Sequence, residues 1–420
     1  MCKLTKLFAS VLVGIIILVG CSGNKADGEP EKQSKDLVVA YYADFRGKNT
    51  MEDYLARFTE ETGIKVTGKP VTGSFGDQLK TGFASKTEPD VFFMDIYEFG
   101  NYADAGLLLN LEPYVNQEHI NKFNQNLLSI FTSDEKLLGI PKDYNTTGLF
   151  YNKVMFDEAG IEYPTNDWSW DDFMAAVEKL DAYFEPLGKH ALVLENTLGN
   201  FQPLLEMMGG DFSYDKNGYP IVNTPEIAEG IKMWDELYEK EYAITPKDLG
   251  RDWSGDAFDN GDGAMTFNGN WMNSYLTESG NDLSYGTVQI PSMNGNEANM
   301  FFTVAWSASA NTSQPENAAT FIEWITSEAM LSEFIQDGGG AIPSMIKLED
   351  EFIKEYPERV GFVEAGKIAS RYDYGIVSPT VVKALEDCTE RLRLGTQTDI
   401  KAGLDEAQSI IEAEYSRLKK

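Results

Sequence analysis

The chain has 420 residues and a formal net charge of −32 at pH 7, from 35 lysines and arginines against 67 aspartates and glutamates. This excess of acid argues against a nucleic-acid-binding protein, because phosphate binding requires clustered basic side chains. The 2 histidines and 3 cysteines leave little for a zinc site or a Ser-His-Asp triad. A binding protein and a hydrolase that uses paired carboxylates remain.

The N-terminus is typical of an exported protein. Residues 7–19 form an apolar run after two lysines, and this run is shorter than the roughly 20 residues that span a membrane. It leads into a Leu-Val-Gly-Cys tetrapeptide ending at Cys21, which resembles a bacterial lipobox. In such signals cleavage precedes the cysteine, which carries a diacylglyceryl group. The alternatives are a plain secretory signal and an N-terminal membrane anchor.

The residues after Cys21 are polar and low in apolar content, which predicts a flexible tether. We therefore expect a lipoprotein signal peptide at residues 1–20 and a tether at 21–36. Two acyl chains on one cysteine suffice for stable anchoring, so the expected location is the cell membrane, lipid-anchored on its extracytoplasmic face. Cys388 lies on a helical pattern and is expected to be a packed thiol.

The region that follows the tether predicts alternating strands and helices. Buried-strand patterns and amphipathic helical patterns follow one another at 37–42, 51–62, 64–66, 75–85, 90–95 and 97–105. This order predicts parallel strands with crossover helices in a layered α/β fold. Ligands in such sheets bind beyond the carboxyl ends of the strands. Asp44, Arg46 and Asp95 follow strand ends and are therefore candidate binding residues.

The remainder of the chain is richer in helices. Helical patterns occupy 168–180, 227–238, 318–335, 381–394 and 400–418, and a strand pattern occupies 264–267. Asn166 or Asp167 is the expected N-terminal capping residue of the first of these helices. The acidic loop at residues 259–263 lacks the spacing of a calcium-binding EF-hand, so no metal site is expected there.

Short motifs along the chain resemble those of family 1 extracellular solute-binding proteins of ABC importers, which are relatives of maltose-binding protein. The motifs occur in family order at 89–95, 102–109, 139–144, 149–153, 156–160, 168–172, 265–271, 306–310 and 340–344. The resemblance covers residues 37–420. It implies a carbohydrate ligand, ABC permease subunits as partners, a monomeric protein, no cofactor and no enzymatic activity.

The resemblance also implies a two-lobed α/β fold of the periplasmic-binding-protein type II, with a ligand cleft that closes by a hinge. The chain would cross between the lobes near Asn145, Val304 and Ile342, so that each lobe is discontinuous. The expected N-terminal lobe comprises 37–145 plus 304–342, and the expected C-terminal lobe comprises 146–303 plus 343–420.

Sugar-binding sites combine flat aromatic side chains, which cover the faces of the sugar ring, with polar groups that bond its hydroxyls. Trp271 matches the family position whose indole stacks on a pyranose. By the same reasoning, the aromatic candidates are Trp253, Trp306 and Tyr372. The polar candidates are Asp44, Arg46, Asp95, Asp143, Asn145 and Asn270.

Other ligands and activities remain open. The stretch at 375–382 has no aromatic residue where maltose-binding protein has a stacking Trp, which disfavours maltodextrin. The same fold could bind a polyamine or ferric iron, and Tyr372 and Tyr374 form a tyrosine pair of the kind found in iron sites. A secreted glycosidase would need two carboxylates roughly 5 to 9.5 Å apart, and no sequence pattern singles out such a pair.

Overall fold

The computed structural model describes residues 36–43, 49–210, 212–336, 340–371 and 374–419. Four residues predicted above for the lipid anchor or the ligand site, Cys21, Asp44, Arg46 and Tyr372, lie outside these ranges. Within the described ranges, no helix combines the length and the apolar character needed to cross a membrane.

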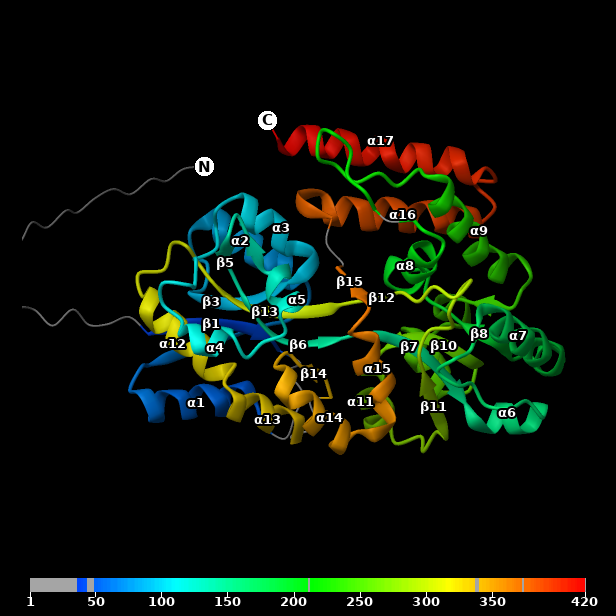
Figure 1. Cartoon of the computed structure of the whole chain (residues 1–420), viewed down its shortest axis with the longest axis horizontal. Coiled ribbons are helices and arrows are strands. Elements are labelled where there is room, and N and C mark those ends of the chain that lie inside the picture. The colour runs from blue at the N-terminus through cyan, green and yellow to red at the C-terminus, as the bar shows by residue number, and fades with distance from the viewer. Residues whose placement is uncertain (1–35, 44–48, 211, 337–339, 372–373, 420) are drawn as a thin grey trace, which may run out of the picture. The chain divides into compact units, whose positions relative to one another are not determined.

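A six-stranded sheet forms one half of the protein, in the strand order β14-β6-β13-β3-β1-β2 (Figure 1). Its strands are β1 (Leu37–Tyr42), β2 (Val66–Val71), β3 (Val91–Asp95), β6 (Ile140–Asn145), β13 (Phe302–Ala308) and β14 (Ile342–Pro343). Strand β1 pairs in parallel with β2 and β3, which confirms the predicted parallel arrangement. Strand β13 runs antiparallel to β3 and β6, and β14 runs antiparallel to β6.

A five-stranded sheet forms the other half, in the order β11-β7-β10-β8-β9. Its strands are β7 (Thr147–Asn152), β8 (His190–Val193), β9 (Ala243–Ile244), β10 (Gly263–Gly269) and β11 (Tyr285–Val288). Strands β10, β8 and β9 are parallel, whereas β7 is antiparallel to β10 and β11. Two separate sheets built this way give the two-lobed α/β fold.

The chain passes from one sheet to the other within a few residues. Strand β6 ends at Asn145 and β7 begins at Thr147, so the first passage takes a single residue between them. The return runs through β12 (Asn299–Met300), which pairs with β15 (Ala369–Ser370), into β13. The six-stranded sheet therefore joins strands from distant parts of the sequence.

The helices around the six-stranded sheet are α1 (Met51–Thr62), α2 (Phe75–Ser85), α3 (Ile96–Asp104), α4 (Gln117–Ile120), α5 (Gln125–Ile130), α12 (Pro315–Ile325) and α13 (Glu328–Gln336). Helix α1 shows why these segments fold locally. A capping box between Thr50 and Asp53 satisfies its first amide groups, and Gly63 ends it at a φ of 74°. Its apolar residues recur at helical spacing and are buried against the sheet.

The remaining helices are α6 (Lys153–Ala159), α7 (Trp170–Phe184), α8 (Leu198–Met207), α9 (Pro225–Glu239), α10 (Ser254–Asp259), α11 (Trp271–Ser279), α14 (Glu349–Glu355), α15 (Val360–Ala365), α16 (Ser378–Arg393) and α17 (Ile400–Leu418). Short elements complete the fold: β4 (Thr132–Ser133), β5 (Lys136–Leu137), and the 3-10 turns η1 (Glu185–Leu187), η2 (Pro246–Leu249), η3 (Ile346–Leu348), η4 (Pro357–Arg359) and η5 (Gly375–Val377).

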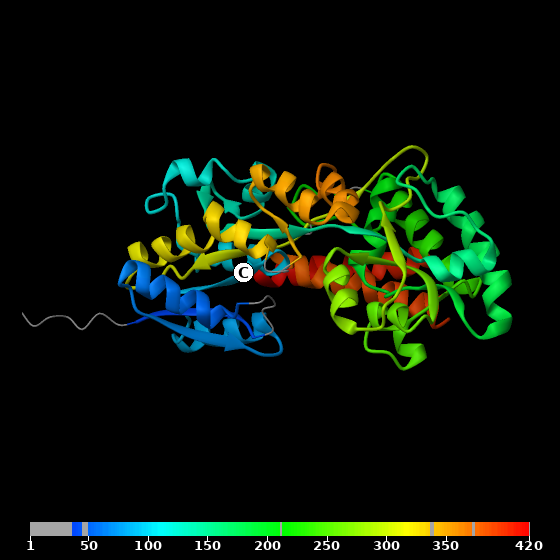
Figure 2. The same cartoon turned by 90° about the horizontal axis from the view of Figure 1, so that it is seen from below.

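The two C-terminal helices contact both halves of the protein. Helix α16 packs against α17, against α8 and α9 on the five-stranded side, and against α3 on the six-stranded side (Figure 1). Figure 2 shows the red C-terminal helix extending behind both halves. An ion pair of 3.3 Å joins Lys419 Nζ, just after α17, to Asp104 of α3. Cys388 of α16 is fully buried, and burial raises the pKa of its thiol to about 11, which confirms the predicted packed thiol.

Several element boundaries differ from those that the sequence predicts, and three of the differences have a clear local reason. The strand expected at 64–66 begins at Val66 and extends to Val71, because β2 is an edge strand with largely exposed residues that include Pro70. The helix expected at 318–335 is divided into α12 and α13 near Thr326, whose hydroxyl donates to the Ile322 carbonyl. Helix α7 is capped by Ser169 and not by Asn166 or Asp167.

Candidate functional site

A pocket of about 200 Å³ lies at the carboxyl ends of β1 and β3. Its lining is Tyr42, Gly73, Ser74, Phe75, Gly76, Leu79, Phe93, Met94, Asp95, Tyr97, Glu98 and Tyr102. The pocket therefore lies where the α/β rule predicts a ligand site. The predicted residue Asp95 is part of it, and Tyr42, the last residue of β1, lies beside it.

Asp95 is the main polar group of this pocket. Its Oδ2 accepts a hydrogen bond of 3.2 Å from the Tyr42 hydroxyl, and burial raises the pKa of the carboxyl from 3.8 to about 7. Tyr97, which is 40% exposed, also has a raised pKa, first from burial and then from the charge of Asp95. A carboxyl group with this pKa exists in both protonation states near neutral pH, so it can both accept and donate hydrogen bonds.

Glu98 adds a second carboxylate to the same pocket. Its Oε1 accepts from Lys80 Nζ at 2.9 Å, whereas its buried Oε2 has no hydrogen-bond partner among the described residues. A buried acceptor without a partner has a desolvation cost, which a ligand hydroxyl would offset. The pocket thus combines aromatic rings with two carboxyl groups that differ in their hydrogen-bond partners.

On the five-stranded side, Trp271 is the first residue of α11 and is 39% exposed. Its indole meets the ring of Phe302 edge-on, with the ring centroids 5.2 Å apart. A Cβ at Gly269 would overlap with this indole, so the ring lies over the backbone at the end of β10 because residue 269 is glycine. Phe302 in turn lies against Gly199 of α8, where a Cβ would be 3.0 Å from the ring. We call Trp271 and Phe302 the aromatic wall.

Trp253 is held close to the same strand. Its ring, half-buried, packs edge-on against Tyr275 at a centroid distance of 4.8 Å. The next residue, Ser254, receives a hydrogen bond of 2.9 Å from Asn268 Nδ2 in β10 and donates one of 2.9 Å to Glu195 Oε1. These bonds join the Trp253 loop to the strand that leads into Trp271.

The passages between the two sheets are held by asparagine side chains. Asn270 Nδ2 donates to Asn145 Oδ1 at 3.1 Å and to the Gly340 carbonyl, and the Asn270 amide donates to the Thr146 carbonyl at 3.1 Å. Asn270 is fully buried, so its side chain connects chain segments and offers no surface to a ligand in this structure. Asp143 is half-buried and forms an ion pair with Lys142.

The placement of Trp306 differs from the expectation of a cleft residue. Its side chain is 0% exposed and packs between Phe93 at 4.2 Å and Phe321 of α12 at 5.4 Å, measured between ring centroids. The reason is the position of β13, which pairs with β3 on one side and β6 on the other, so that its side chains enter the core. Trp306 therefore supports Phe93, which lines the pocket, and presents no free ring face.

The structure brings the predicted residues together in three groups: Asp95 at the pocket, Trp271 and Trp253 around β10, and Asn145 with Asn270 at the passage.

Sequence reasoning missed Tyr42, Tyr97 and Phe302. Tyr42 and Tyr97 follow the strand ends so closely that the predicted topology could have singled them out. Phe302 carries no such signal, because its contact with Trp271 joins two distant segments. Among the described residues, no three His, Cys, Asp or Glu side chains gather as a metal site would require.

Comparisons with known proteins agree on one family. A family model described as bacterial extracellular solute-binding protein matches residues 53–360. The multiple sugar-binding protein of Streptococcus mutans is 22% identical over 355 residues, which cover 79% of this chain and 80% of that protein. The galactooligosaccharide-binding protein of Bacillus subtilis is 25% identical over 337 residues, which cover 78% of this chain and 76% of that protein.

A solved structure shares the fold. It is an ABC substrate-binding protein from Listeria monocytogenes in complex with cycloalternan, and it superposes with a TM-score of 0.80 at 21% identity. The match covers 91% of this chain and 99% of the other. This likeness shows the two-lobed α/β fold for the present chain.

Proposed function

The chain belongs to the family of bacterial extracellular solute-binding proteins, and we propose that its solute is a carbohydrate, which it delivers to the permease of an ABC importer. Family membership places the protein outside the cytoplasm. The proposed ligand is a mono- or oligosaccharide bound in a cleft between the lobes, whose proposed boundaries are 37–145 plus 304–342 and 146–303 plus 343–420.

The observation that carries the proposal is the exposed aromatic wall together with the pocket around Asp95. An exposed indole such as that of Trp271 offers a flat apolar surface for the C–H face of a sugar ring. The carboxyl and hydroxyl groups of Asp95 and Tyr42 can bond the hydroxyl edges. The names of the relatives, which bind multiple sugars, galactooligosaccharide and cycloalternan, support the same class of ligand.

Individual residues take different parts in this proposal. Trp271 stacks on the sugar, and Asp95, Asp143, Asn145 and Trp253 contribute further contacts. Asn270 acts by holding Asn145 and the chain passages in place. Asp44, Arg46 and Tyr372 remain proposed contacts from the sequence alone.

A thermal-shift screen of the purified protein tests the ligand class. We expect the melting temperature to rise with one group of mono- or oligosaccharides, because a ligand that binds only the native state stabilises it by about 2.7 kcal/mol at 100 times its Kd. Spermidine and ferric citrate belong in the same screen. A shift with spermidine, or a visible tyrosinate-to-iron absorption band with ferric citrate, in place of a sugar response would contradict the proposal.

We further propose that binding occurs without turnover. The protein is incubated with labelled oligosaccharides that produce a thermal shift, and the sugars are then separated by size. The expected result is unchanged oligosaccharide after prolonged incubation. Release of shorter products in proportion to the protein concentration would show a glycosidase instead.

The lipid anchor at Cys21 is also a proposal. Substitution of Cys21→Ser in the full chain is expected to release the protein from the membrane fraction, because the thioether-linked acyl chains are lost. Wild-type protein expressed in parallel is the control, and metabolic labelling with a fatty acid identifies the modification. Equal membrane retention of both forms would argue for a spanning anchor.

Size-exclusion chromatography of the released protein tests the proposed monomer.

A further inference from the structure

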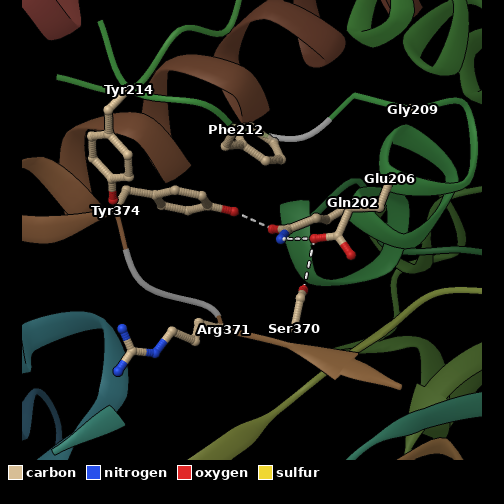
Figure 3. A pocket seen from close by; sticks show the side chains of 8 residues that line it. All are labelled: Gln202, Glu206, Gly209, Phe212, Tyr214, Ser370, Arg371 and Tyr374. Atoms are coloured by element: carbon tan, nitrogen blue, oxygen red, sulfur yellow. Dashed lines mark hydrogen bonds between the residues drawn. The ribbon is translucent and has the colours of Figure 1, made fainter. Parts of the chain in front are cut away.

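A second pocket, of about 530 Å³, lies apart from the one around Asp95 and shares none of its lining residues. Its described lining comes from α8, from residues soon after α8, and from residues between the start of β15 and η5 (Figure 3). Its lining residues are Gln202, Glu206, Gly209, Phe212, Tyr214, Ser370, Arg371 and Tyr374. Its volume lies within the 300–1,000 Å³ typical of small-molecule sites.

The floor of this pocket is a connected set of polar side chains. The Tyr374 hydroxyl donates to Gln202 Oε1, and Gln202 Nε2 donates to Glu206 Oε1 at 2.7 Å. The Ser370 hydroxyl donates to the same Glu206 oxygen at 2.7 Å. Gln202 is 1% exposed, so the network holds its groups in fixed orientations. Glu206 Oε2 takes no hydrogen bond from a described residue and remains as an acceptor.

The sides of the pocket are aromatic. The rings of Phe212 and Tyr374 lie 4.9 Å apart, and Tyr214 beside them is 53% exposed. Tyr374 is fixed from behind, because its amide donates to the Ser378 hydroxyl of α16 at 2.6 Å. The pocket therefore offers ring faces next to an ordered set of hydrogen-bonding groups.

The charges around the pocket select a neutral ligand. Arg371 at its rim is exposed and donates to the Ser129 carbonyl of α5, and its charge disfavours a cation. Glu206 disfavours an anion, and burial raises the pKa of its carboxyl. A neutral polyhydroxylated molecule can use both groups, since hydroxyls donate to the carboxylate and accept from the guanidinium.

The pocket is also distinct from the aromatic wall. Gly199 contacts Phe302 at the first turn of α8, whereas Gln202 and Glu206 lie one and two turns further along the same helical face. At 1.5 Å per residue, Glu206 is roughly 10 Å from Gly199 along the helix axis. A sugar ring stacked on Trp271 and a ring in this pocket would therefore occupy different places.

We propose that this pocket is a second binding site for a neutral saccharide unit, separate from the site at Trp271. The proposal rests on the proposed function only in taking saccharides as the ligand class. Tyr214 covers one face of the sugar ring, and Glu206 Oε2 accepts from one of its hydroxyls.

Isothermal titration calorimetry of the full-length protein tests the proposal. The ligand is the saccharide that gives the largest thermal shift, and the detergent has no sugar headgroup. The variants are Trp271→Ala, Tyr214→Ala, the double variant Trp271→Ala/Tyr214→Ala, and Glu206→Gln as a conservative change at the floor. Tyr183→Ala is the matched control, because Tyr183 is a similarly exposed tyrosine, 44% exposed, on the distant helix α7. Melting temperatures without ligand confirm that each variant is folded.

We expect Trp271→Ala to retain a saturable saccharide site, and the double variant to bind at least tenfold more weakly than Trp271→Ala alone. Glu206→Gln should weaken the same site, and Tyr183→Ala should match the wild type. The proposal would be overturned if Trp271→Ala bound no saccharide while Tyr214→Ala bound it as the wild type does. That result would show a single site at Trp271. A wild-type protein that binds no saccharide would overturn the proposed function as well.

Discussion

The two parts of the candidate site, the pocket around Asp95 and the aromatic wall, differ in what they offer a ligand. The pocket on the six-stranded side contains ionisable groups, with Asp95 at a pKa of about 7 and Glu98 beside it. The aromatic wall, formed by Trp271 at the start of α11 and Phe302 at the start of β13, consists of two apolar rings and exposes 39% of Trp271. The pocket around Asp95 can select the positions of hydroxyl groups, whereas the aromatic wall supplies contact area.

This division of roles has a general reason. A hydrogen bond to a buried group discriminates strongly, because an analogue without the matching hydroxyl leaves that group unpaired. A flat ring discriminates little between sugars but contributes to the binding of all of them. The experiments below remove one side at a time.

The largest effect is expected from Trp306→Ala, which removes support beneath the six-stranded side. The fully buried indole packs on Phe93, and its loss leaves a large cavity. We expect the free energy of unfolding to fall by about 3–5 kcal/mol. Urea unfolding monitored by circular dichroism measures this loss. A loss below about 1 kcal/mol would contradict the assignment of Trp306 to the core.

Trp271→Ala removes the aromatic wall and should act on binding. We expect sugar affinity to fall by about 2 kcal/mol, roughly 30-fold, as for a central aromatic contact in an interface. The unfolding free energy should change little, because the ring is partly exposed. Titration calorimetry and urea unfolding separate the two effects. Normal affinity in this variant would remove the stacking role.

Gly269→Ala moves the same ring without deleting it. The added methyl group would overlap with the indole of Trp271, which must then shift from the strand end. We expect a smaller affinity loss, about 1 kcal/mol or fivefold, because the ring remains available in a displaced position. Gly280→Ala, at the end of α11, controls for a glycine substitution outside the wall. An unchanged affinity in Gly269→Ala would show that the position of the indole does not matter.

The last effect is a pH dependence that belongs to the six-stranded side. Burial raises the pKa of Asp95 from 3.8 to about 7, so the native state binds this proton more tightly than the unfolded chain. The contribution of the protonated carboxyl to stability is fully present below about pH 4 and is lost as the pH rises through 7. Asp95→Asn should remove this pH-dependent component, which for a pKa shift of this size amounts to at most about 4 kcal/mol between these limits.

Thermal unfolding of wild type and Asp95→Asn at a series of pH values measures the difference. Trp271→Ala should keep the wild-type pH dependence, because its wall holds no titrating group. If the difference between wild type and Asp95→Asn is independent of pH, the carboxyl titrates at its ordinary value and the contrast between the two sides disappears.

Local patterns in the sequence predicted much of the fold. Helix α17 spans Ile400–Leu418 as expected. The apolar spacing and the capping residues of α1 likewise predicted its observed range, Met51–Thr62. The strand ends that carry Asp95 followed from the alternation of strands and helices. These features depend on residues close together in the chain, which is why the sequence alone could supply them.

The missing parts depend on contacts between distant segments. Nothing near Trp306 in the sequence shows that β13 lies inside the sheet, between β3 and β6. The contact of Phe302 with Trp271 and the pocket along α8 likewise arise only when separate segments come together. The family resemblance supplied the expected lobes and Trp271, but not which neighbouring rings complete the wall.

The buried side chain of Asn270 restricts how the two sheets can move. Its amide bonds Asn145 Oδ1, at the passage from β6 to β7, and the Gly340 carbonyl, just before β14. Sliding one sheet past the other would break both bonds, whereas rotation about an axis through this amide would keep them. The unliganded protein would then explore few relative orientations, so little orientational entropy would remain to be lost when a ligand is captured.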